Sequence, residues 1–322
     1  MQDKPCVLVL NKALAVLRPD LEKTYRVAAL YDYASFDLLL QDFGQDIRAL
    51  ITFGGHPPEP GLLARLPELG LIAVPGAGFD GMDPADLNAR GIALTSGAGS
   101  NADDVADFAM GLMIAGARGI CESERMVRGG LWTELVPGVM RRSIRDRPAG
   151  IVGLGAIGTA IAKRLEAFGC PTSWWGPREK ADAQFARAPD LLSLARDSDI
   201  LFVAAPATAA TRNMIDAAVI EALGPDGLLI NIARGELVDE DAVIAALRAG
   251  SLGGAALDVQ AEEPTPIRKW ADVPNLILTP HIGGYATASV RTAADMLMEN
   301  LRRFFAGEPL LSPVRPAADR AA

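Results

Sequence analysis

Histidine and cysteine are scarce in this chain of 322 residues, which contains 2 histidines and 3 cysteines. Cys6, Cys121 and Cys170 are odd in number and far apart, so they form neither a metal-binding motif nor the paired framework of a disulfide-rich protein. We therefore expect no metal site, and we expect the thiols to be reduced and part of the core.

Positive charge is also in short supply, because 31 Lys and Arg face 40 Asp and Glu, for a net charge of −9. Without an excess of cations the surface cannot neutralise many phosphates, which argues against nucleic acids and anionic membranes as partners. No apolar run is long enough to span a bilayer. The run at 6–10 is too short for a signal peptide and is predicted to be a strand. These absences favour a cytoplasmic protein.

Apolar side chains are abundant, at 50% of the residues, and at this length they favour two lobes. Short apolar runs alternate with helical patterns, which predicts βαβ units and parallel sheets. The expected strands of the first lobe are 6–10, 27–30, 49–53, 71–74 and 92–95. Those of the second begin at 150 and continue at 172–175, 200–205, 228–232, 255–259 and 276–279. Expected helices include one from Pro84, with Asp83 as its N-cap, and two long ones at 102–117 and 286–305.

Three glycines interrupt the pattern after the strand that begins at 150, with the spacing Gly153-x-Gly155-x-x-Gly158, and a helical pattern follows at 159–168. Gly153 permits a sharp turn, Gly155 lets the backbone approach a pyrophosphate, and Gly158 lets the helix pack closely on its strand. The spacing predicts a dinucleotide site at the start of the helix. The alternative is a close-packed turn without a ligand.

A second stretch, 76–81, has the same glycine spacing but carries Asp80 where phosphates would lie. Its helix is expected to start only at Pro84. We therefore expect this loop, together with Gly54 and Gly55 after the preceding strand, to bind a small carboxylate through backbone N–H groups. Ordinary glycine turns are the alternative.

The strand at 172–175 is followed by Gly176, Arg178, Glu179 and Lys180. An NAD site places an acidic residue about twenty positions beyond the glycines, where it binds the ribose 2′-hydroxyl. Here two cations replace it, which favours NADP(H) and its 2′-phosphate, with NAD(H) as the second possibility. The alternative is that Arg178 is solvated and Glu179 supplies the acid.

Arg234, Glu263 and His281 each follow a different predicted strand of the second lobe. Because the carboxyl ends of parallel strands share one edge of a sheet, we expect the three side chains to converge. An imidazolium can protonate a keto oxygen, and a guanidinium can bind a carboxylate through two hydrogen bonds. A neighbouring carboxylate favours the charged imidazole and orients its ring. Taken singly, each residue also has an ordinary structural explanation.

Four motifs, at 153–158, 231–239, 256–264 and 279–284, together resemble the D-isomer-specific 2-hydroxyacid dehydrogenase family, and most of all its glyoxylate/hydroxypyruvate reductase branch. The resemblance implies an α/β fold of two doubly wound parallel-sheet lobes. One is a flavodoxin-like substrate-binding (catalytic) domain made of residues 1–98 and 286–322. The other is a Rossmann-type dinucleotide-binding domain at 99–285.

The resemblance also implies roles for individual residues. The catalytic residues are Arg234 for the substrate carboxylate, His281 as acid/base and Glu263 as its partner. The implied cofactor-binding residues are Gly153, Gly155, Ala156, Ile157, Gly158, Arg178, Pro206, Thr211, Ile232, Ala233, Asp258 and Gly283. The implied substrate-binding residues are Gly54, Gly55, Gly76, Ala77 and Gly78, in addition to Arg234 and His281.

A homodimer joined through the cofactor lobe, with an active site in the cleft, is implied as well. The expected reaction is the reduction of glyoxylate or hydroxypyruvate to a D-2-hydroxy acid. An alternative is a reductase of larger 2-keto acids such as phenylpyruvate, with Phe79, Trp132 and Tyr285 lining an apolar pocket. Another is a nucleotide-sensing regulator. The arginine-rich segment 121–147 is interpreted either as an arm that packs on a second subunit or as an exposed basic loop. In the first interpretation, Trp132 would reach the second subunit.

Ala156 and Gly284 depart from the family pattern, because many relatives have a polar residue at the first position and some have Ser at the second. Pyrophosphate binding would then depend more on the backbone. Glu263 argues against formate dehydrogenase activity, for which the wider family has Gln at that position.

Overall fold

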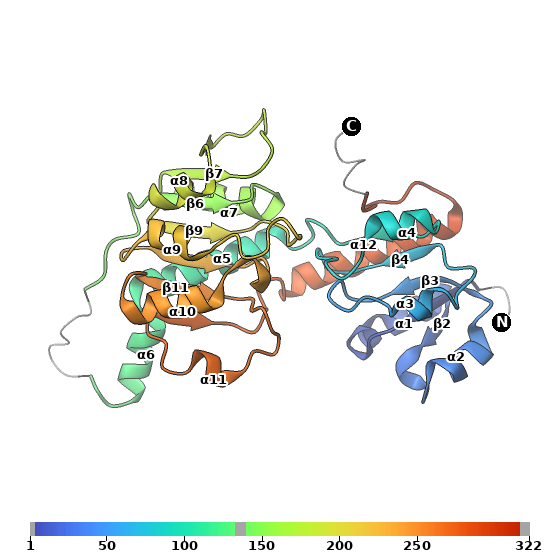
Figure 1. The fold of residues 1–322 in the computed structure, drawn as a ribbon. Helices are drawn as coiled ribbons and strands as arrows, with labels where there is room; N and C mark the ends of the chain where they lie inside the picture. The colour runs from blue at the N-terminus through green and yellow to red at the C-terminus, as the bar shows by residue number, and fades with distance from the viewer. Residues whose placement is uncertain (1–3, 133–139, 316–322) are drawn as a thin grey trace. The chain divides into compact units, whose positions relative to one another are not determined.

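The computed structural model describes residues 4–132 and 140–315, and the chain divides into two compact units. Unit 1 comprises Met1–Asn101 and Thr287–Ala322, and unit 2 comprises Ala102–Ala286 (Figure 1). These bounds lie one to three residues from the domain limits expected from the sequence. The two parallel-sheet α/β lobes confirm the predicted fold class.

The sheet of unit 1 has five parallel strands in the order β2-β1-β3-β4-β5. The strands are β1 (Cys6–Val9), β2 (Arg26–Ala29), β3 (Ile47–Ile51), β4 (Leu71–Ala73) and β5 (Ala93–Thr95). This is the strand order of flavodoxin-like folds, as the family resemblance implies.

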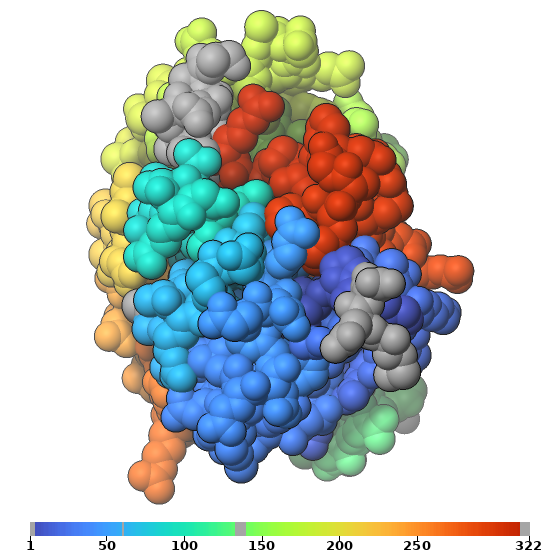
Figure 2. Space-filling model, turned by 90° about the vertical axis from the view of Figure 1, so that its right-hand side faces the viewer, coloured from blue at the N-terminus to red at the C-terminus, as the bar shows by residue number. Residues whose placement is uncertain are grey.

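Helices cover both faces of this sheet. They are η1 (Lys12–Leu17), α1 (Arg18–Thr24), η2 (Leu30–Asp32), α2 (Phe36–Phe43), α3 (Pro60–Leu63), α4 (Pro84–Ala89) and α12 (Thr287–Ala306). One core packs Leu39 of α2 and Leu87 of α4 against the sheet, and the other packs Leu297 and Leu301 of α12. In Figure 2 the red C-terminal residues of unit 1 accordingly lie beside blue residues from the N-terminal segment.

The sheet of unit 2 has seven parallel strands in the order β12-β11-β10-β9-β6-β7-β8. They are β6 (Ala149–Val152), β7 (Thr172–Trp175), β8 (Ala186–Arg187), β9 (Ile200–Val203), β10 (Leu228–Asn231), β11 (Gly254–Leu257) and β12 (Leu276–Leu278). The order reverses at β6, as in Rossmann folds, where ligands bind beyond the carboxyl ends of the strands. The residues paired at those ends are Val152, Val203, Asn231, Leu257 and Leu278, so the loops that follow leave the sheet at one level.

Helices cover both faces of the unit 2 sheet (Figure 1). They are α5 (Ala102–Arg118), α6 (Ile120–Arg128), α7 (Ala156–Ala167), α8 (Leu191–Arg196), α9 (Ala217–Leu223), η3 (Gly235–Leu237), α10 (Glu240–Ala249) and α11 (Ile267–Trp270). Helices α5 and α7 pack on the face that presents Ile151 and Phe202, whereas α8, α9 and α10 pack on the face that presents Val152 and Val203. Apolar residues on both faces explain why these strands appear in the sequence as continuous apolar runs.

Several strands end earlier than predicted. Strand β9 stops at Val203 rather than at 205, and β11 stops at Leu257 rather than at 259. Ala205 and Val259 are nevertheless buried, because the chain stays in the interior as it turns away from the sheet. Hydrophobicity therefore marks burial here, not the end of strand pairing. Helix α4 begins at Pro84 with Asp83 as its N-cap, which confirms that prediction.

The structure of the arginine-rich segment 121–147 differs from one of its two interpretations, that of an exposed basic loop. Residues 120–128 form α6, and part of the expected arm, 133–139, lies outside the described residues. Arg141 pairs with Glu122, Arg142 with Asp199, and Arg147 is 6% exposed. The segment is not a simple exposed basic loop, because these guanidinium groups are used within the chain.

The three cysteines are free thiols, as expected, although Cys121 is exposed and not part of the core. Burial raises the pKa of Cys6 and of Cys170. Within 4–132 and 140–315, no group of three or more His, Cys, Asp or Glu side chains is placed to hold a metal ion. No helix of this part of the chain combines the length and the apolar character needed to cross a membrane.

Candidate active site

His281 lies three residues beyond β12, in a backbone conformation that residues other than glycine seldom adopt, with φ of 53°. Its N–H donates hydrogen bonds to the carbonyl oxygens of Asp258 (2.8 Å) and Thr279 (3.0 Å), which hold the strained turn. Its ring atom Nδ1 lies 2.8 Å from Oε2 of Glu263. Since Nδ1 is engaged by the carboxylate, Nε2 is the ring nitrogen left to meet a substrate.

Glu263 lies in the loop after β11, and its Oε1 accepts a hydrogen bond of 3.0 Å from the N–H of Gln260. Burial alone would raise the pKa of Glu263. The hydrogen bonds from His281 and Gln260, together with the positive charges of His281 and Arg234, outweigh burial and hold this pKa below its ordinary value. Glu263 is therefore a carboxylate at neutral pH.

Arg234 follows β10 in a turn that Asn231 holds. Asn231 is fully buried; its Nδ2 donates to the carbonyl of Arg234 (2.9 Å) and its Oδ1 accepts from the N–H of Ala233 (3.0 Å). The next residue, Gly235, packs so closely that a Cβ atom there would lie 1.9 Å from the carbonyl carbon of Gln260. The Arg234 turn and the Glu263 loop are thus in direct contact.

Asp258 organises the segment that carries His281. Its carboxylate is 2% exposed and accepts hydrogen bonds from Thr279 Oγ1 (2.6 Å), the N–H of Ile282 (3.0 Å) and the N–H of Gly283 (2.8 Å). The family resemblance assigns Asp258 and Gly283 to the cofactor. In the structure they form the support of the His281 loop, and a cofactor contact remains a prediction.

The glycine-rich turn after β6 has the features of a phosphate-binding loop. Gly153 has φ of +95°, and a Cβ at Gly158 would lie 2.1 Å from the carbonyl oxygen of Gly153, so neither position accommodates a side chain without rearrangement. Gly155 is the N-cap of α7 without a side-chain cap, and a Cβ on it would meet nothing within 4 Å. Open space therefore adjoins the N–H groups that start a twelve-residue helix.

Helix α7 starts at Ala156, three residues earlier than the helical pattern in the sequence suggests. Ala156, Ile157 and Gly158 therefore form its first turn, and their N–H groups are the ones that a pyrophosphate would meet. Gly158 interrupts the apolar pattern because of its contact with Gly153, not because it lies in the loop.

Two cations follow β7, and they differ in their surroundings. Arg178 is exposed, whereas Lys180 Nζ donates a hydrogen bond to the carbonyl of Leu154 within the glycine-rich turn. Glu179 lies 3.7 Å from Arg187, which also donates to the carbonyl of Gly176. The positive charge next to the turn thus comes from Lys180.

The remaining predicted cofactor residues follow β9 and β10. Thr211 Oγ1 donates to the carbonyl of Pro206 (2.9 Å) and accepts from the N–H of Thr208 (2.8 Å), which closes this loop. Ile232 and Ala233 are buried beside the Arg234 turn.

The predicted substrate residues of unit 1 lie in two adjoining loops after β3 and β4. Gly54 packs on the carbonyl of Gly78, 1.9 Å from where its Cβ would be, and accepts a hydrogen bond from Gly81 N–H (3.1 Å). The carbonyl of Gly76 accepts from Gly97 N–H (2.8 Å). Among the described residues, the N–H groups of Gly55, Gly76, Ala77 and Gly78 make no backbone–backbone hydrogen bond. They are suitable donors to a small carboxylate.

Sequence reasoning missed several residues that position this site, namely Asn231, Glu240, Gln260, Lys269 and Thr279. A weak signal existed for Asn231, because a polar residue at the end of a continuous apolar run is a candidate for a buried, fully hydrogen-bonded group. The other four gave no local signal.

Residues 110–283 match the family described as D-isomer specific 2-hydroxyacid dehydrogenase, NAD binding domain. The chain is 37% identical to glyoxylate/hydroxypyruvate reductase A of Arabidopsis thaliana, over 96% of this chain and 98% of the relative. It is 35% identical to hydroxyphenylpyruvate reductase of Plectranthus scutellarioides, over 96% and 98%.

Among solved structures, the NADPH-dependent glyoxylate/hydroxypyruvate reductase of Sinorhizobium meliloti, in complex with NADP and malonate, superimposes with a TM-score of 0.86. The two sequences are 32% identical, and the match covers 97% of each chain.

Proposed function

This chain belongs to the D-isomer-specific 2-hydroxyacid dehydrogenase family, and we propose that it reduces glyoxylate and hydroxypyruvate to D-2-hydroxy acids with NAD(P)H. The observation that supports this function best is the pair of His281 and Glu263, joined at 2.8 Å in the unit that also contains the glycine-rich turn. Arg234, whose charge acts on the same carboxylate, supplies the cation that a 2-keto acid requires.

Each of the three side chains has one task in this reaction. Arg234 binds the substrate carboxylate through its planar guanidinium and orients the keto group. His281 holds a proton at Nε2 and donates it to the keto oxygen as negative charge develops there. Glu263 binds Nδ1, which keeps the ring in place and leaves Nε2 for the substrate.

The residues of unit 2 fit a nicotinamide dinucleotide, which supplies the hydride when it is bound. The open space over Gly155 and the uncapped start of α7 suit the pyrophosphate. We assign Pro206, Thr211, Ile232 and Ala233 to the rest of the cofactor on the family resemblance and on their place beyond β9 and β10.

NADPH is the cofactor that we propose for this enzyme. Arg178 is exposed just beyond β7, and Glu179 lies near Arg187. An exposed guanidinium suits a 2′-phosphate, because it offers several donors to one anion. The NADPH dependence of the relative from Sinorhizobium meliloti supports the same choice.

A panel of 2-keto acids assayed with both reduced cofactors tests the function. We expect the highest kcat/KM with glyoxylate or hydroxypyruvate and NADPH, and a D-2-hydroxy acid as the product. The same panel tests phenylpyruvate and 4-hydroxyphenylpyruvate, which the hydroxyphenylpyruvate reductase of Plectranthus scutellarioides makes the second candidate class. Slow turnover of every acid together with tight NADPH binding would instead indicate a nucleotide-sensing regulator.

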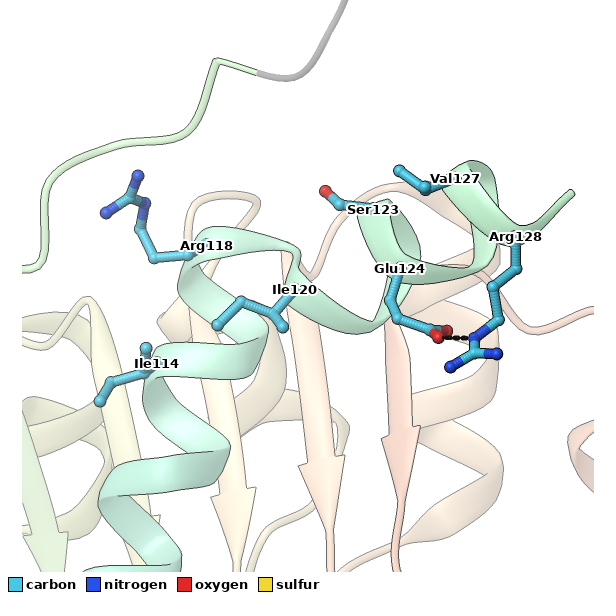
Figure 3. Close-up of a pocket in the computed structure, with 7 residues that line it drawn as sticks. All are labelled: Ile114, Arg118, Ile120, Ser123, Glu124, Val127 and Arg128. Carbon is cyan, nitrogen blue, oxygen red and sulfur yellow. Dashed lines mark hydrogen bonds and ion pairs between the residues drawn. The ribbon is translucent and has the colours of Figure 1, made fainter. Parts of the chain in front are cut away.

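A homodimer is the assembly that we propose, and α6 is the surface that supports it. Ile120 and Val127 of α6 are exposed and line a pocket together with Ile114 of α5 and with Glu124 and Arg128, which form an ion pair (Figure 3). Clustered exposed apolar side chains are typical of interaction surfaces. The exposed Trp132 lies a few residues beyond α6.

Sedimentation analysis tests the dimer. We expect Val127→Asp to shift the protein towards the monomer, whereas Val16→Asp, at an exposed apolar residue of η1 in unit 1, leaves the assembly unchanged. A wild-type monomer at micromolar concentration would contradict the proposal. We also propose the cytoplasm as the location of the enzyme, a proposal that the free thiols support.

A further inference from the structure

Glu240, the first residue of α10, is a buried carboxylate that the reaction described above does not use. It is 5% exposed. Its Oε1 accepts a hydrogen bond of 2.7 Å from the N–H of Ala261, and its Oε2 lies 2.5 Å from Nζ of Lys269 in α11. Each carboxylate oxygen thus has a different donor, and the two donors come from the two ends of the segment 261–269.

Burying a carboxylate costs free energy unless charged or polar partners compensate. Lys269 is such a partner: burial lowers its pKa, but the hydrogen bond and the charge of Glu240 outweigh burial and raise it, so this side chain stays cationic. The N-terminus of α10 adds a favourable dipole. A buried and fully partnered carboxylate of this kind holds its neighbours in one geometry.

The Ala261 N–H that Glu240 binds adjoins the N–H that binds Glu263. The N–H of Gln260 donates to Oε1 of Glu263, while the next N–H along the chain, that of Ala261, donates to Glu240. Two consecutive backbone N–H groups are therefore held by two different carboxylates. The peptide group between Gln260 and Ala261 packs on Gly235, the residue directly after Arg234. Rotation of this peptide group would therefore disturb both the Glu263 loop and the Arg234 turn.

We propose that Glu240 is a positioning residue, which holds the Gln260–Ala261 backbone in the orientation that presents the Glu263 carboxylate to His281. This inference rests on the proposed function for its kinetic consequences. Glu240 touches neither Glu263 nor His281 through the bonds described, so its effect is transmitted by the backbone between them.

Two substitutions test the role of Glu240. Glu240→Ala removes both acceptors, and we expect kcat for the keto acid to fall about ten- to a hundred-fold with a smaller change in KM, as misplaced catalytic groups produce. In Glu240→Gln the amide nitrogen must face one of the two donors, so one bond is lost, and we expect kcat to fall about three- to ten-fold. The glutamine variant decides the question if the alanine variant does not fold.

The pH profile separates positioning from general stabilisation. The bonds from Gln260 and His281 lower the pKa of Glu263, so weakening them lets this pKa rise towards its ordinary value. The acidic limb of the kcat/KM profile then moves to higher pH in both variants. Asp241→Asn is the matched control, because Asp241 is the neighbouring acid, is 91% exposed and lies 3.8 Å from Lys269. We expect wild-type kcat and an unshifted limb in this variant.

An NMR titration gives a readout that does not need turnover. The chain has only two histidines, so the ring signals of His281 can be assigned with a His56→Asn variant. These signals respond at acidic pH to the ionisation of Glu263, the hydrogen-bond partner of the ring. We expect the midpoint of that response to rise in Glu240→Ala and Glu240→Gln and to stay in place in Asp241→Asn.

Folded Glu240 variants with wild-type kcat, an unshifted acidic limb and an unshifted NMR midpoint would overturn the inference. Failure of the proposed function has a different signature. In that case the wild-type protein reduces none of the keto acids, and the NMR midpoints alone decide whether Glu240 positions Glu263.

Discussion

The backbone N–H of His281 donates a hydrogen bond of 2.8 Å to the carbonyl oxygen of Asp258, 23 positions earlier in the chain. The carboxylate of Asp258 holds the same segment on both sides of the histidine, through Thr279 Oγ1 and through the N–H groups of Ile282 and Gly283. The left-handed backbone of His281 therefore depends on Asp258.

The first prediction concerns this support. Asp258→Asn replaces one acceptor with an NH2 group that cannot accept from the donors around it, and we expect a loss of about 1–3 kcal/mol of stability. We also expect kcat to fall, because the imidazole loses its fixed position. Urea unfolding and steady-state kinetics measure the two effects. Asp272→Asn, at an exposed position, is the control, and equal behaviour of the two variants would contradict the role of Asp258.

The second prediction concerns the proton donor. His281→Asn removes the group that protonates the keto oxygen, so we expect kcat to fall by about 10²–10⁴-fold with little change in NADPH affinity. Single-turnover kinetics and fluorescence titration of NADPH measure these quantities. His56→Asn, at the other histidine, should leave kcat unchanged. If His281→Asn turned over substrate as fast as the wild type, the mechanism would be wrong.

The third prediction concerns carboxylate binding. Arg234→Lys keeps the charge but loses the planar pair of donors, so we expect kcat/KM for the keto acid to fall about 10–100-fold, chiefly through KM. Arg212→Lys tests the same change at an exposed guanidinium that pairs with Glu236, and should have no effect. An unchanged KM in Arg234→Lys would exclude a bidentate contact.

The fourth prediction concerns pH. Because the pKa of Glu263 is lower in the folded protein than its ordinary value of 4.5, Glu263 contributes stability above about pH 4.5. That contribution is lost as the pH falls through the folded pKa. We therefore expect Glu263→Gln to be less stable than the wild type at pH 7, and the difference to shrink as the pH falls below 4.5 towards the folded pKa.

Denaturant unfolding at pH 7 and at acidic pH measures the difference in stability between Glu263→Gln and the wild type. The carboxylate is 37% exposed, so solvent screens the contribution and keeps it modest. A stability difference that does not depend on pH would contradict an ionised Glu263 at neutral pH.

The fifth prediction concerns cofactor choice. We expect Arg178→Ala to lower kcat/KM for NADPH about ten-fold, because one charged contact to the 2′-phosphate is lost, while kcat/KM for NADH changes little. The NADH measurement on the same variant is the internal control. An equal loss with both cofactors would assign Arg178 to general binding or stability and not to the phosphate.

Local patterns were sufficient for much of the fold. Strands with apolar residues on both faces read as continuous apolar runs, and the N-cap at Asp83 and the proline after it marked the start of α4. Prediction from local patterns fails where a contact distant from the local pattern decides the structure. The sequence pattern predicts the start of α7 three residues too late, because Gly158 resembles a loop residue although its contact with Gly153 is what requires a glycine there.

The sequence by itself determined the types of residue in the site and their order along the chain, because Arg234, Glu263 and His281 follow successive strands of a predictable parallel sheet. Only the tertiary structure decided how they are held. Asp258 and Glu240 bind groups about twenty positions away, and such a pairing leaves no periodic trace in the chain. Burial makes these bonds strong and specific, and burial is a property of the folded molecule.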